Sequence, residues 1–291
     1  MASEKKEKLA WDTPDFAQMY TSAEKLTGSY AQFLLERANI SNLDEEQELV
    51  VLDQACGTGI VSVKLMDMLS DILKVKLDLT CADFADAMVD FTEKRIEQAG
   101  WINARAVKAD AMDTKLPSSN YTHIFLNFGP MIFPDWEAGL RELHRMLQPG
   151  GTLAMSSWEK VGWMPDVRAA FALDPELPPM PEDSTLRRAF SPDGEWDRPE
   201  WIRETVQQAG FTEVMVESVP HTSVLDGTSE FMGMVNMTVG MITSRSWSKD
   251  EQEKYADRAK SLTANYMTTK YGDGAIKWDW VAILTTAKKP M

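Results

Sequence analysis

Cysteine and long hydrophobic runs are both scarce in this chain. Its 291 residues include two cysteines, Cys56 and Cys81, so we expect free thiols in a reducing compartment rather than a disulfide framework. No apolar stretch approaches the roughly 18 residues that a membrane span requires. The first residues, MASEKKEKLAW, lack the apolar core of a secretory signal. These absences favour a cytoplasmic protein.

Basic residues and histidines are also in short supply. The chain has 30 Lys and Arg against 45 Asp and Glu, a formal net charge of −15. An acidic chain without a basic stripe binds polyanions poorly, so we expect neither nucleic acid nor an anionic membrane as a partner. The histidines His123, His144 and His221 lie far apart without zinc-ligand spacing, so we expect no metal.

The rest of the composition is typical of a globular protein, with a high content of methionine and tryptophan. Hydrophobic residues make up 44% and charged residues 26%, and there are 18 Met and 10 Trp. A chain of this length buries roughly three quarters of its surface on folding. Most Met and Trp will fill the core, but methionine also suits adaptable apolar pockets. Where the methionines cluster therefore bears on the ligand.

Strand-like and helix-like stretches alternate along the chain, which is typical of a doubly wound parallel sheet. We predict strands at 49–53, 76–82, 104–108, 121–127, 152–158, 211–219 and 278–287. Helices are predicted at 60–69, 86–99, 136–147, 165–173, 185–190, 200–208, 228–245 and 249–270. In open α/β sheets, ligands bind beyond the carboxyl ends of the strands.

The most informative stretch is residues 50–59, VVLDQACGTG, where a strand runs into a small-residue loop. Gly57 and Gly59 let the backbone approach a ligand closely, and the helix that follows offers N–H groups. A dinucleotide fingerprint needs a third glycine where this chain has Ser62, and Asp53 would repel a pyrophosphate. An acid here suits an ammonium group, which favours S-adenosylmethionine over a nicotinamide or flavin cofactor. A glycine-rich turn without a ligand is the remaining alternative.

Acidic residues also end the next two predicted strands. Asp83 can accept hydrogen bonds from both ribose hydroxyls, as the comparable acid does in dinucleotide folds, and Phe84 can pack on adenine. Asp110 can accept from the adenine amino group, and Met112 can cover the ring. The alternatives are a helix N-cap at Asp83 and a solvated turn at Asp110.

Taken together, these motifs resemble a known enzyme family. DQACGTG, CADFADAM, KADAMD, LNFGPMIFPD and the turn QPGG, in this order over residues 49–158, look like a class I S-adenosylmethionine-dependent methyltransferase. Residues 20–32 and 121–124 look more like fungal secondary-metabolite enzymes of the gliotoxin-type dithiol S-methyltransferase group. Residues 127–135 are similar to quinone-biosynthesis C-methyltransferases. Ala55 departs from the family pattern, which usually has a glycine there.

The resemblance implies the cofactor and its contacts. S-adenosyl-L-methionine would bind at the strand ends, and an N-terminal Tyr and Thr, here Tyr20 and Thr27, would close over it. The cofactor-binding residues expected on this basis are Tyr20, Thr27, Asp53, Ala55, Cys56, Gly57, Gly59, Asp83, Phe84, Met88, Asp110, Ala111, Met112, Asn127 and Phe128.

The alternation and the resemblance together define the expected architecture. We predict an α/β, Rossmann-like doubly wound sheet of about seven strands, mostly parallel with an antiparallel last strand, plus helical lid segments. The expected organisation is a single domain over 1–291. It has an N-terminal helical cover at 1–45, a cofactor-binding core at 46–158, and lid or substrate-binding segments at 159–198 and 220–272.

The acceptor chemistry is less defined by the sequence. Methyl transfer from a sulfonium is an in-line displacement of an activated group, so positioning supplies much of the rate. A thiol is partly ionised near neutral pH, whereas an alcohol or a carbon acid needs a general base. The catalytic residues stay unassigned, because the candidate bases His123, His221 and Glu159 form no dyad with visible spacing.

Residues 228–245 carry a broad, Met-rich apolar face at helical spacing. This face either lines an adaptable pocket or is buried between layers. For the pocket we expect contacts from Phe133, Trp158, Met234, Met237 and Met241. We predict a methyltransferase acting on a small, largely apolar secondary metabolite, with S-methylation of a thiol as the leading hypothesis. O- or C-methylation of a phenol- or quinone-like metabolite and a cofactor-binding regulator without turnover stay open, as does the oligomeric state.

Overall fold

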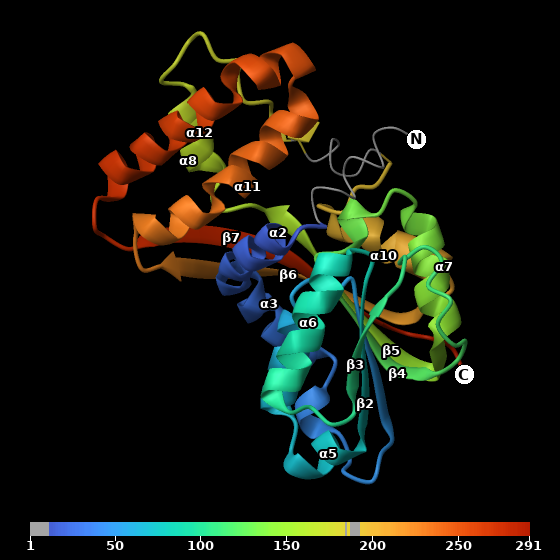
Figure 1. The fold of residues 1–291 in the computed structure, drawn as a ribbon. Helices are drawn as coiled ribbons and strands as arrows, with labels where there is room; N and C mark the ends of the chain where they lie inside the picture. Colours follow the sequence, from blue (N-terminus) through green and yellow to red (C-terminus); the bar gives the residue numbers. More distant parts are fainter. Residues whose placement is uncertain (1–11, 184, 187–192) are drawn as a thin grey trace.

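A seven-stranded sheet with the strand order β3-β2-β1-β4-β5-β7-β6 forms the centre of the molecule (Figure 1). The computed structural model describes residues 12–183, 185–186 and 193–291. The strands are β1 (Leu49–Gln54), β2 (Leu77–Asp83), β3 (Ala104–Lys108), β4 (Tyr121–Asn127), β5 (Leu147–Lys160), β6 (Thr212–Leu225) and β7 (Ile276–Lys288). The first five run parallel, and β7 is antiparallel to both of its neighbours, β5 and β6. The predicted fold class is therefore confirmed.

Helices cover both faces of this sheet. Successive strand residues point to opposite faces, so Val51 is buried in one cluster with Leu34 and Leu65, whereas Leu52 is buried in another with Leu143. The first cluster takes in α3 (Glu24–Arg37), α4 (Ile60–Met68), α5 (Asp71–Lys76) and α6 (Asp86–Ala99), and the second α7 (Trp136–Met146) and α10 (Pro199–Gln208). Burial on both faces explains why these strands read as near-continuous apolar runs.

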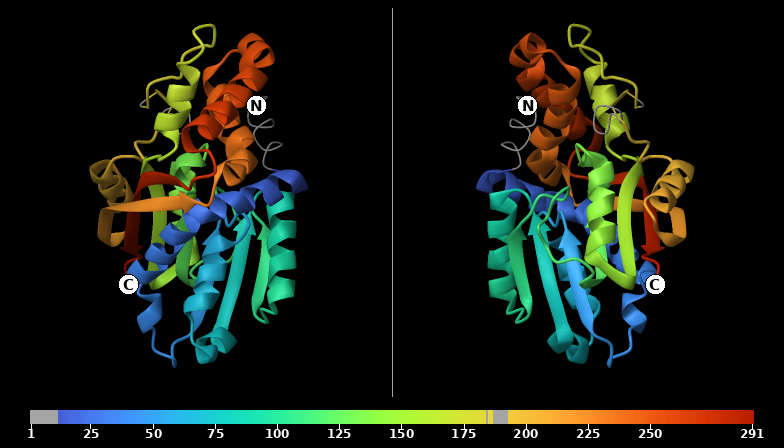
Figure 2. Two further views of the ribbon diagram at one scale, coloured as in Figure 1. Left: turned by 90° about the vertical axis from the view of Figure 1, so that its left-hand side faces the viewer. Right: turned by 90° about the vertical axis from the view of Figure 1, so that its right-hand side faces the viewer.

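The remaining helices gather beyond the carboxyl ends of the parallel strands (Figure 2). α2 (Pro14–Tyr20), the 3-10 turn at Thr21–Ala23 and the start of α3 make up the N-terminal cover, whose residues 1–11 lie outside the described residues. α8 (Met164–Phe171), α11 (Thr228–Ser246) and α12 (Lys249–Tyr271) form what we call the lid. None of the described helices is both long and apolar enough to cross a membrane.

A buried carboxylate fastens the lid to the sheet. Asp166 of α8 is 4% exposed. It accepts hydrogen bonds from Lys270 Nζ at 2.5 Å, from the Tyr271 hydroxyl at 2.8 Å and from Trp278 Nε1 at 2.8 Å. Burial opposes ionisation of this carboxyl, but the three donors outweigh it and lower its pKa. One side chain thus joins α8, α12 and β7.

Several boundaries differ from those predicted. The sequence patterns missed α5, whose six residues are too short for an apolar period but begin at a Ser70 cap. β5 and β6 extend to Lys160 and Leu225, because both pair with β7 along its length, so residues 220–225 belong to the sheet rather than to the lid. β6 tolerates Pro220 because it is an edge strand. Most of the helix predicted at 185–190 lies outside the described residues.

Candidate active site

The loop between β1 and α4 carries three left-handed backbone positions. Ala55, Gly57 and Gly59 have φ angles of 51°, 55° and 84°. Glycine adopts these angles freely, whereas an alanine is strained there by about 1–2 kcal/mol. The N–H of Cys56 donates to the carbonyl of Ala82 at 3.0 Å and ties the loop to β2. Burial raises the pKa of the Cys56 thiol, which favours its neutral form.

Asp53 lies behind this loop. Its Oδ2 accepts hydrogen bonds from the Ser62 N–H at 3.1 Å and the Ser62 hydroxyl at 2.7 Å, and the residue is 1% exposed. Burial raises the pKa of this carboxyl to about 7, although the bonds from Ser62 oppose the shift. Asp53 therefore fixes the start of α4 from inside the fold. The direct contact with a ligand's ammonium group that the sequence suggested stays a prediction.

Asp83, at the end of β2, holds the other side of the loop. It is 6% exposed and accepts hydrogen bonds from the Gly57 N–H at 2.9 Å and the Ala85 N–H at 3.1 Å. Burial raises its pKa, and the backbone donors oppose that rise. The Asp83 carbonyl accepts from the Ala109 N–H at 2.8 Å, which draws the end of β3 alongside. The three predicted strand ends thus meet at one edge.

Small and apolar residues surround these carboxylates. Asp110 Oδ1 accepts from the Met112 N–H at 3.1 Å in a tight turn, with Ala111 buried between them. Met88, which is 2% exposed, lies in a small cluster against which Phe84 packs. A flat aromatic ligand beside Asp83 and Asp110 would therefore contact apolar side chains, among them Phe84 and Met88.

Gln54, which the sequence reasoning did not single out, is an orphaned polar group at the end of β1. The residue is 1% exposed, and neither Nε2 nor Oε1 of its amide has a hydrogen-bond partner in the described structure. A buried, unpaired amide is costly unless a ligand satisfies it. Its position immediately before the glycine loop was the available signal. The Asp83 carboxylate beside the Gly57 turn would repel a phosphate, so this edge of the sheet fits a polar, phosphate-free cofactor.

The N-terminal cover closes over the loop. A Cβ on Gly57 would lie 3.3 Å from the Tyr20 ring. Burial, with the nearby carboxylates of Asp83 and Glu24, raises the pKa of Tyr20 to about 12. Thr27 follows in α3, where its hydroxyl donates to the Ala23 carbonyl at 3.2 Å. The structure thus brings both predicted closing residues to this edge of the sheet.

Asn127 and Phe128 continue the edge at the end of β4. The Ser156 hydroxyl donates to Asn127 Oδ1 at 2.7 Å and accepts from the Phe128 N–H at 2.9 Å. Phe128 takes a left-handed φ of 58°, and its ring stacks on Trp158 with centroids 3.7 Å apart. Trp158 belongs to β5, so this stack leads from the glycine loop toward the lid.

A cavity of about 640 Å³ lies between the cover, the end of β5 and the lid. Tyr20, Thr27 and Phe128 line both this cavity and the predicted cofactor site, so the two adjoin. The other apolar walls come from Phe16, Met19, Met131, Trp158, Trp163, Met164, Trp196, Met237, Met241 and Trp280, among others. The volume suits a small molecule.

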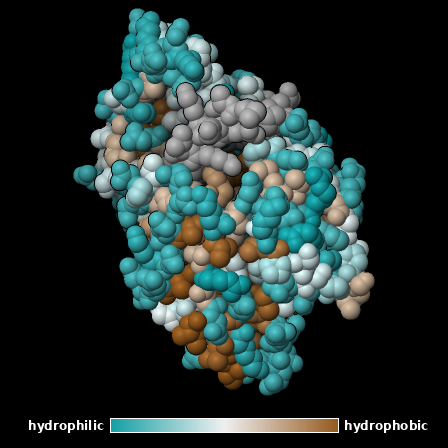
Figure 3. Space-filling view, turned by 45° about the vertical axis from the view of Figure 1, so that its right-hand side comes forward, coloured by the Kyte–Doolittle hydropathy of each residue, from teal (hydrophilic) through white to brown (hydrophobic). Residues whose placement is uncertain are grey.

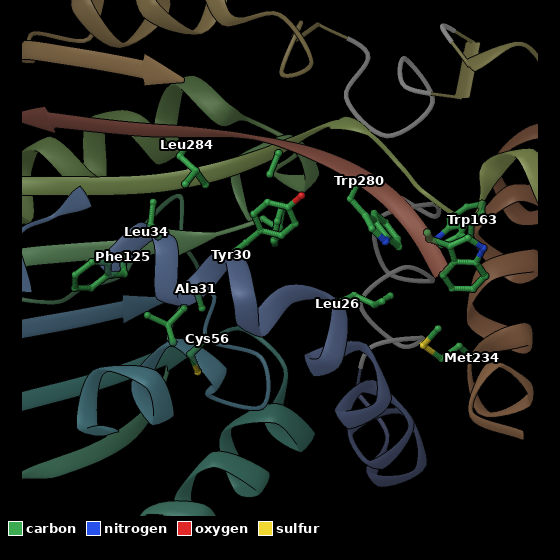
Figure 4. Close-up of a cluster of buried hydrophobic side chains, with 14 of the residues drawn as sticks. Leu26, Tyr30, Ala31, Leu34, Cys56, Phe125, Trp163, Met234, Trp280 and Leu284 are labelled. Carbon is green, nitrogen blue, oxygen red and sulfur yellow. The ribbon is translucent and has the colours of Figure 1, made fainter. Parts of the chain in front are cut away.

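The predicted acceptor contacts are only partly in this cavity. Trp158, Met237 and Met241 line it. Met234 instead lies in the core, 1% exposed, in one cluster with Trp163 (Figure 4). Phe133 packs beneath α7, where a Cβ on Gly139 would lie 2.7 Å from its ring. The missed contacts, such as Met19 and Met131, come from segments whose contribution depends on tertiary packing.

Of the three candidate bases, Glu159 alone lines the cavity. His123 is 6% exposed within β4 and lies 3.0 Å from the Thr122 hydroxyl, and burial lowers its pKa to about 4. His221 is held between the rings of Tyr30 and Phe33, at centroid distances of 5.8 and 5.6 Å. Neither histidine reaches the cavity.

A second hollow lies at the opposite end of the sheet. It has a volume of about 430 Å³ and is lined by residues such as Val75, Leu77, Ile102 and Ala104. Leu77 and Ala104 begin β2 and β3, so this hollow faces the amino ends of the strands. Figure 3 shows apolar residues grouped at this lower end of the molecule. No loop of the candidate site reaches it.

Comparison with known proteins gives the fold first. The chain shares its fold with Haemonchus contortus phosphoethanolamine N-methyltransferase 2 in complex with S-adenosyl-L-methionine. The TM-score is 0.58 at 15% identity, over 96% of this chain and 58% of the other. Residues 51–151 match the family described as a methyltransferase domain.

Two curated relatives narrow this class. The chain is 36% identical over 279 residues to Methyltransferase tpcH of Aspergillus fumigatus, covering 94% of this chain and 96% of that protein. It is 34% identical over 278 residues to acetylaranotin bis-thiomethyltransferase of Aspergillus terreus, covering 95% of each. The chain therefore belongs to this family of fungal secondary-metabolite methyltransferases, and its methyl donor is S-adenosylmethionine.

Proposed function

We propose that this enzyme methylates the sulfur of a thiol on a small, largely apolar metabolite. The observation that carries the proposal is the methionine- and tryptophan-lined cavity that shares Tyr20, Thr27 and Phe128 with the cofactor edge. An acceptor in this cavity lies next to the methyl donor. The bis-thiomethyltransferase relative supports sulfur as the acceptor atom.

The cofactor contacts follow from the placement of the strand ends. We assign Asp83 to the ribose hydroxyls and Asp110 to the adenine amino group, with Phe84, Met88, Ala111 and Met112 around the ring. Ala55, Cys56, Gly57 and Gly59 would hold the methionine moiety with their backbone, flanked by Asn127 and Phe128. Asp53 would act indirectly, through Ser62 and the start of α4.

Tyr20 and Thr27 would separate the bound donor from water. The sulfonium supplies an activated methyl group, and the walls of the cavity align the acceptor sulfur with it. The thiol would lose its proton to solvent water, the thiolate sulfur would form a bond to the methyl carbon, and the bond from that carbon to the sulfonium sulfur would break, releasing S-adenosylhomocysteine. His123 and His221 lie outside the cavity, and Glu159 is the one candidate base that lines it. We propose that the acceptor's own acidity, rather than Glu159, supplies the nucleophile. The two free, buried cysteines support a reducing, cytoplasmic setting.

The test is product identification with matched acceptors. Purified enzyme with methyl-labelled S-adenosylmethionine is given an aromatic dithiol, the corresponding phenol and a hydroquinone, and each product is identified by mass spectrometry and NMR. We expect methylation at sulfur, with the dithiol preferred. Methyl transfer only to oxygen or carbon would replace this proposal with an O- or C-methyltransferase. Cofactor binding without any turnover would favour a regulatory protein.

A further inference from the structure

Glu159 lies at an irregular point of β5. Trp158 pairs with Ala282 of β7, and Lys160 pairs with the next residue along, Val281. Glu159 is thus an extra residue on β5, as in a β-bulge. Bulges turn side chains away from the regular alternation and are frequent beside active sites. This one lies at the carboxyl end of β5, and both Trp158 and Glu159 line the cavity.

The Glu159 carboxylate is polar and incompletely paired. Its Oε2 is buried and has no hydrogen-bond partner among the described residues. Two other cavity carboxylates differ, because Asp183 pairs with Arg168 at 2.6 Å and Asp197 also has a partner. The Trp196 Nε1 donor is likewise buried and unpaired, but it carries no charge. A buried carboxylate oxygen without a donor is the costlier of the two.

We propose that Glu159 recognises an O–H or N–H donor on the methyl acceptor and so determines specificity. The inference rests on the proposed function, since it concerns the acceptor of that reaction. Lys160, Asp183, Asp197 and Arg245 also line the cavity, but Glu159 is the lining carboxylate with a buried oxygen that lacks a donor among the described residues. A few such polar groups fix the orientation of a ligand more than its hydrophobic area does. The preferred substrates are therefore apolar thiols that carry a second polar hydrogen away from sulfur. Glu159 positions this group and takes no proton from the thiol.

The experiment uses two probes that differ by one donor. Naphthalene-2-thiol has no polar hydrogen apart from its S–H, whereas 6-hydroxynaphthalene-2-thiol adds a hydroxyl. Their S-methyl products, which no longer react, are titrated calorimetrically into enzyme saturated with S-adenosylhomocysteine. The two thiols are also compared by kcat and KM. The binding measurement does not depend on turnover, so failure of S-methylation is seen separately from failure of this inference.

Wild-type enzyme should bind the hydroxylated probe roughly tenfold or more tightly than the plain one, because hydrogen bonds to charged groups are the stronger ones. Glu159→Met, which keeps the length of the side chain, should abolish this preference. Glu159→Gln should reduce it to a few-fold and raise KM for the hydroxylated thiol, with kcat changing by less than about threefold. Glu204→Gln, on the exposed side of α10, is the matched control and should retain the wild-type preference.

Three results would overturn the inference. The first is equal binding of the two probes by wild-type enzyme, and the second is a preference that survives in Glu159→Met. The third is a loss of a hundredfold or more in kcat for the plain thiol in Glu159→Gln, because such a loss identifies a general base instead.

Discussion

Gly57 is the residue at which the loop geometry and the cover meet. Its φ of 55° is left-handed, and a Cβ there would lie 3.3 Å from the Tyr20 ring. A β-branched side chain resists this φ and occupies the space next to the ligand. We expect Gly57→Val to abolish binding of S-adenosylhomocysteine in calorimetry, while circular dichroism shows a folded chain.

Ala55 provides the matched control in the same loop. Its φ of 51° strains an alanine but not a glycine. Ala55→Gly should bind the cofactor product normally and raise the free energy of unfolding by about 0.5–1 kcal/mol, the relief being partly offset by unfolded-state entropy. Normal binding by Gly57→Val would show that the cofactor lies elsewhere.

Asp83 is the residue whose loss should weaken cofactor binding most directly. If Asp83 accepts from two ribose hydroxyls as proposed, Asp83→Ala removes a charged acceptor from both donors, and the variant should bind S-adenosylhomocysteine about 1–3 kcal/mol more weakly. Asp83→Asn keeps the shape of the side chain and one acceptor oxygen for the Gly57 N–H. Its affinity for S-adenosylhomocysteine should lie between those of wild type and Asp83→Ala. Unchanged affinity in a folded Asp83→Ala protein would contradict the ribose assignment.

At the scale of elements, the first turn of α3 ties the cover to the cofactor loop. Glu24 accepts hydrogen bonds from the Thr58 hydroxyl at 2.5 Å and from Arg95 Nη1 at 2.9 Å, and Arg95 Nη1 also donates to the Thr58 carbonyl at 2.7 Å. Glu24→Gln leaves Arg95 without a counter-charge and loosens the closed position of Tyr20. We expect cofactor affinity to fall by about 1–2 kcal/mol, since these groups are largely buried.

The neighbouring Lys25 is the control for this element. It pairs with Asp226 and Glu230 next to and within α11, but its side chain is 49% exposed. Exposed ion pairs contribute little, so Lys25→Gln should leave cofactor affinity within about twofold of wild type. Equal effects of the two substitutions would show that the Glu24 contacts do not secure the loop.

The helices and strands also show which structural features sequence patterns alone can predict. The spacing of apolar residues and the capping signals located α6 and β4 to the residue, because both are decided locally. The extension of β5 and the bulge at Glu159 were not predictable, since both depend on pairing with β7, which lies more than a hundred residues away. Helical periodicity likewise selected Met234 with Met237, although only packing decides which side of α11 faces the cavity.

For the whole molecule, acid stability should reflect the burial of His123. Its folded-state pKa is about 4, below the ordinary value of 6.5, because burial disfavours the charged form. Between these values the unfolded chain binds a proton that the folded chain does not. This contribution is therefore fully present above pH 6.5 and is lost as the pH falls toward 4, by up to about 3 kcal/mol.

Denaturant unfolding of wild type and His123→Phe at pH 8 and pH 5 measures this effect. Wild type should lose more stability between the two pH values than the variant. Asp53, whose pKa of about 7 exceeds its ordinary value, acts in the opposite sense in both proteins and cancels in the comparison. Equal losses in the two proteins would show that His123 is not buried in its neutral form.

The overall architecture was predictable because the alternation of strands and helices restricts the chain to few topologies. The loop motif then located the cofactor edge, and the carboxyl ends of β1, β2 and β3 meet there as parallel strands require. The acceptor cavity was less predictable, because its walls come from the cover, β5 and the lid, which are distant in sequence. Chemistry carried by one motif can be read from sequence, whereas a cavity shared by several segments needs the fold.

The central claim, methyl transfer to a thiol by an enzyme that aligns its substrates, is tested most directly by the pH dependence of kcat/KM. Benzyl thiol and the more acidic thiophenol are compared, with S-adenosylmethionine saturating. The rate should rise with each thiol's own ionisation, near pH 8–9 for the ordinary thiol and lower for the acidic one. In His123→Phe, His221→Asn and Glu159→Gln, the limiting rate should fall less than about tenfold. A rise at the same pH for both thiols, or a hundredfold loss in one variant, would contradict the account and assign the proton to an enzyme base.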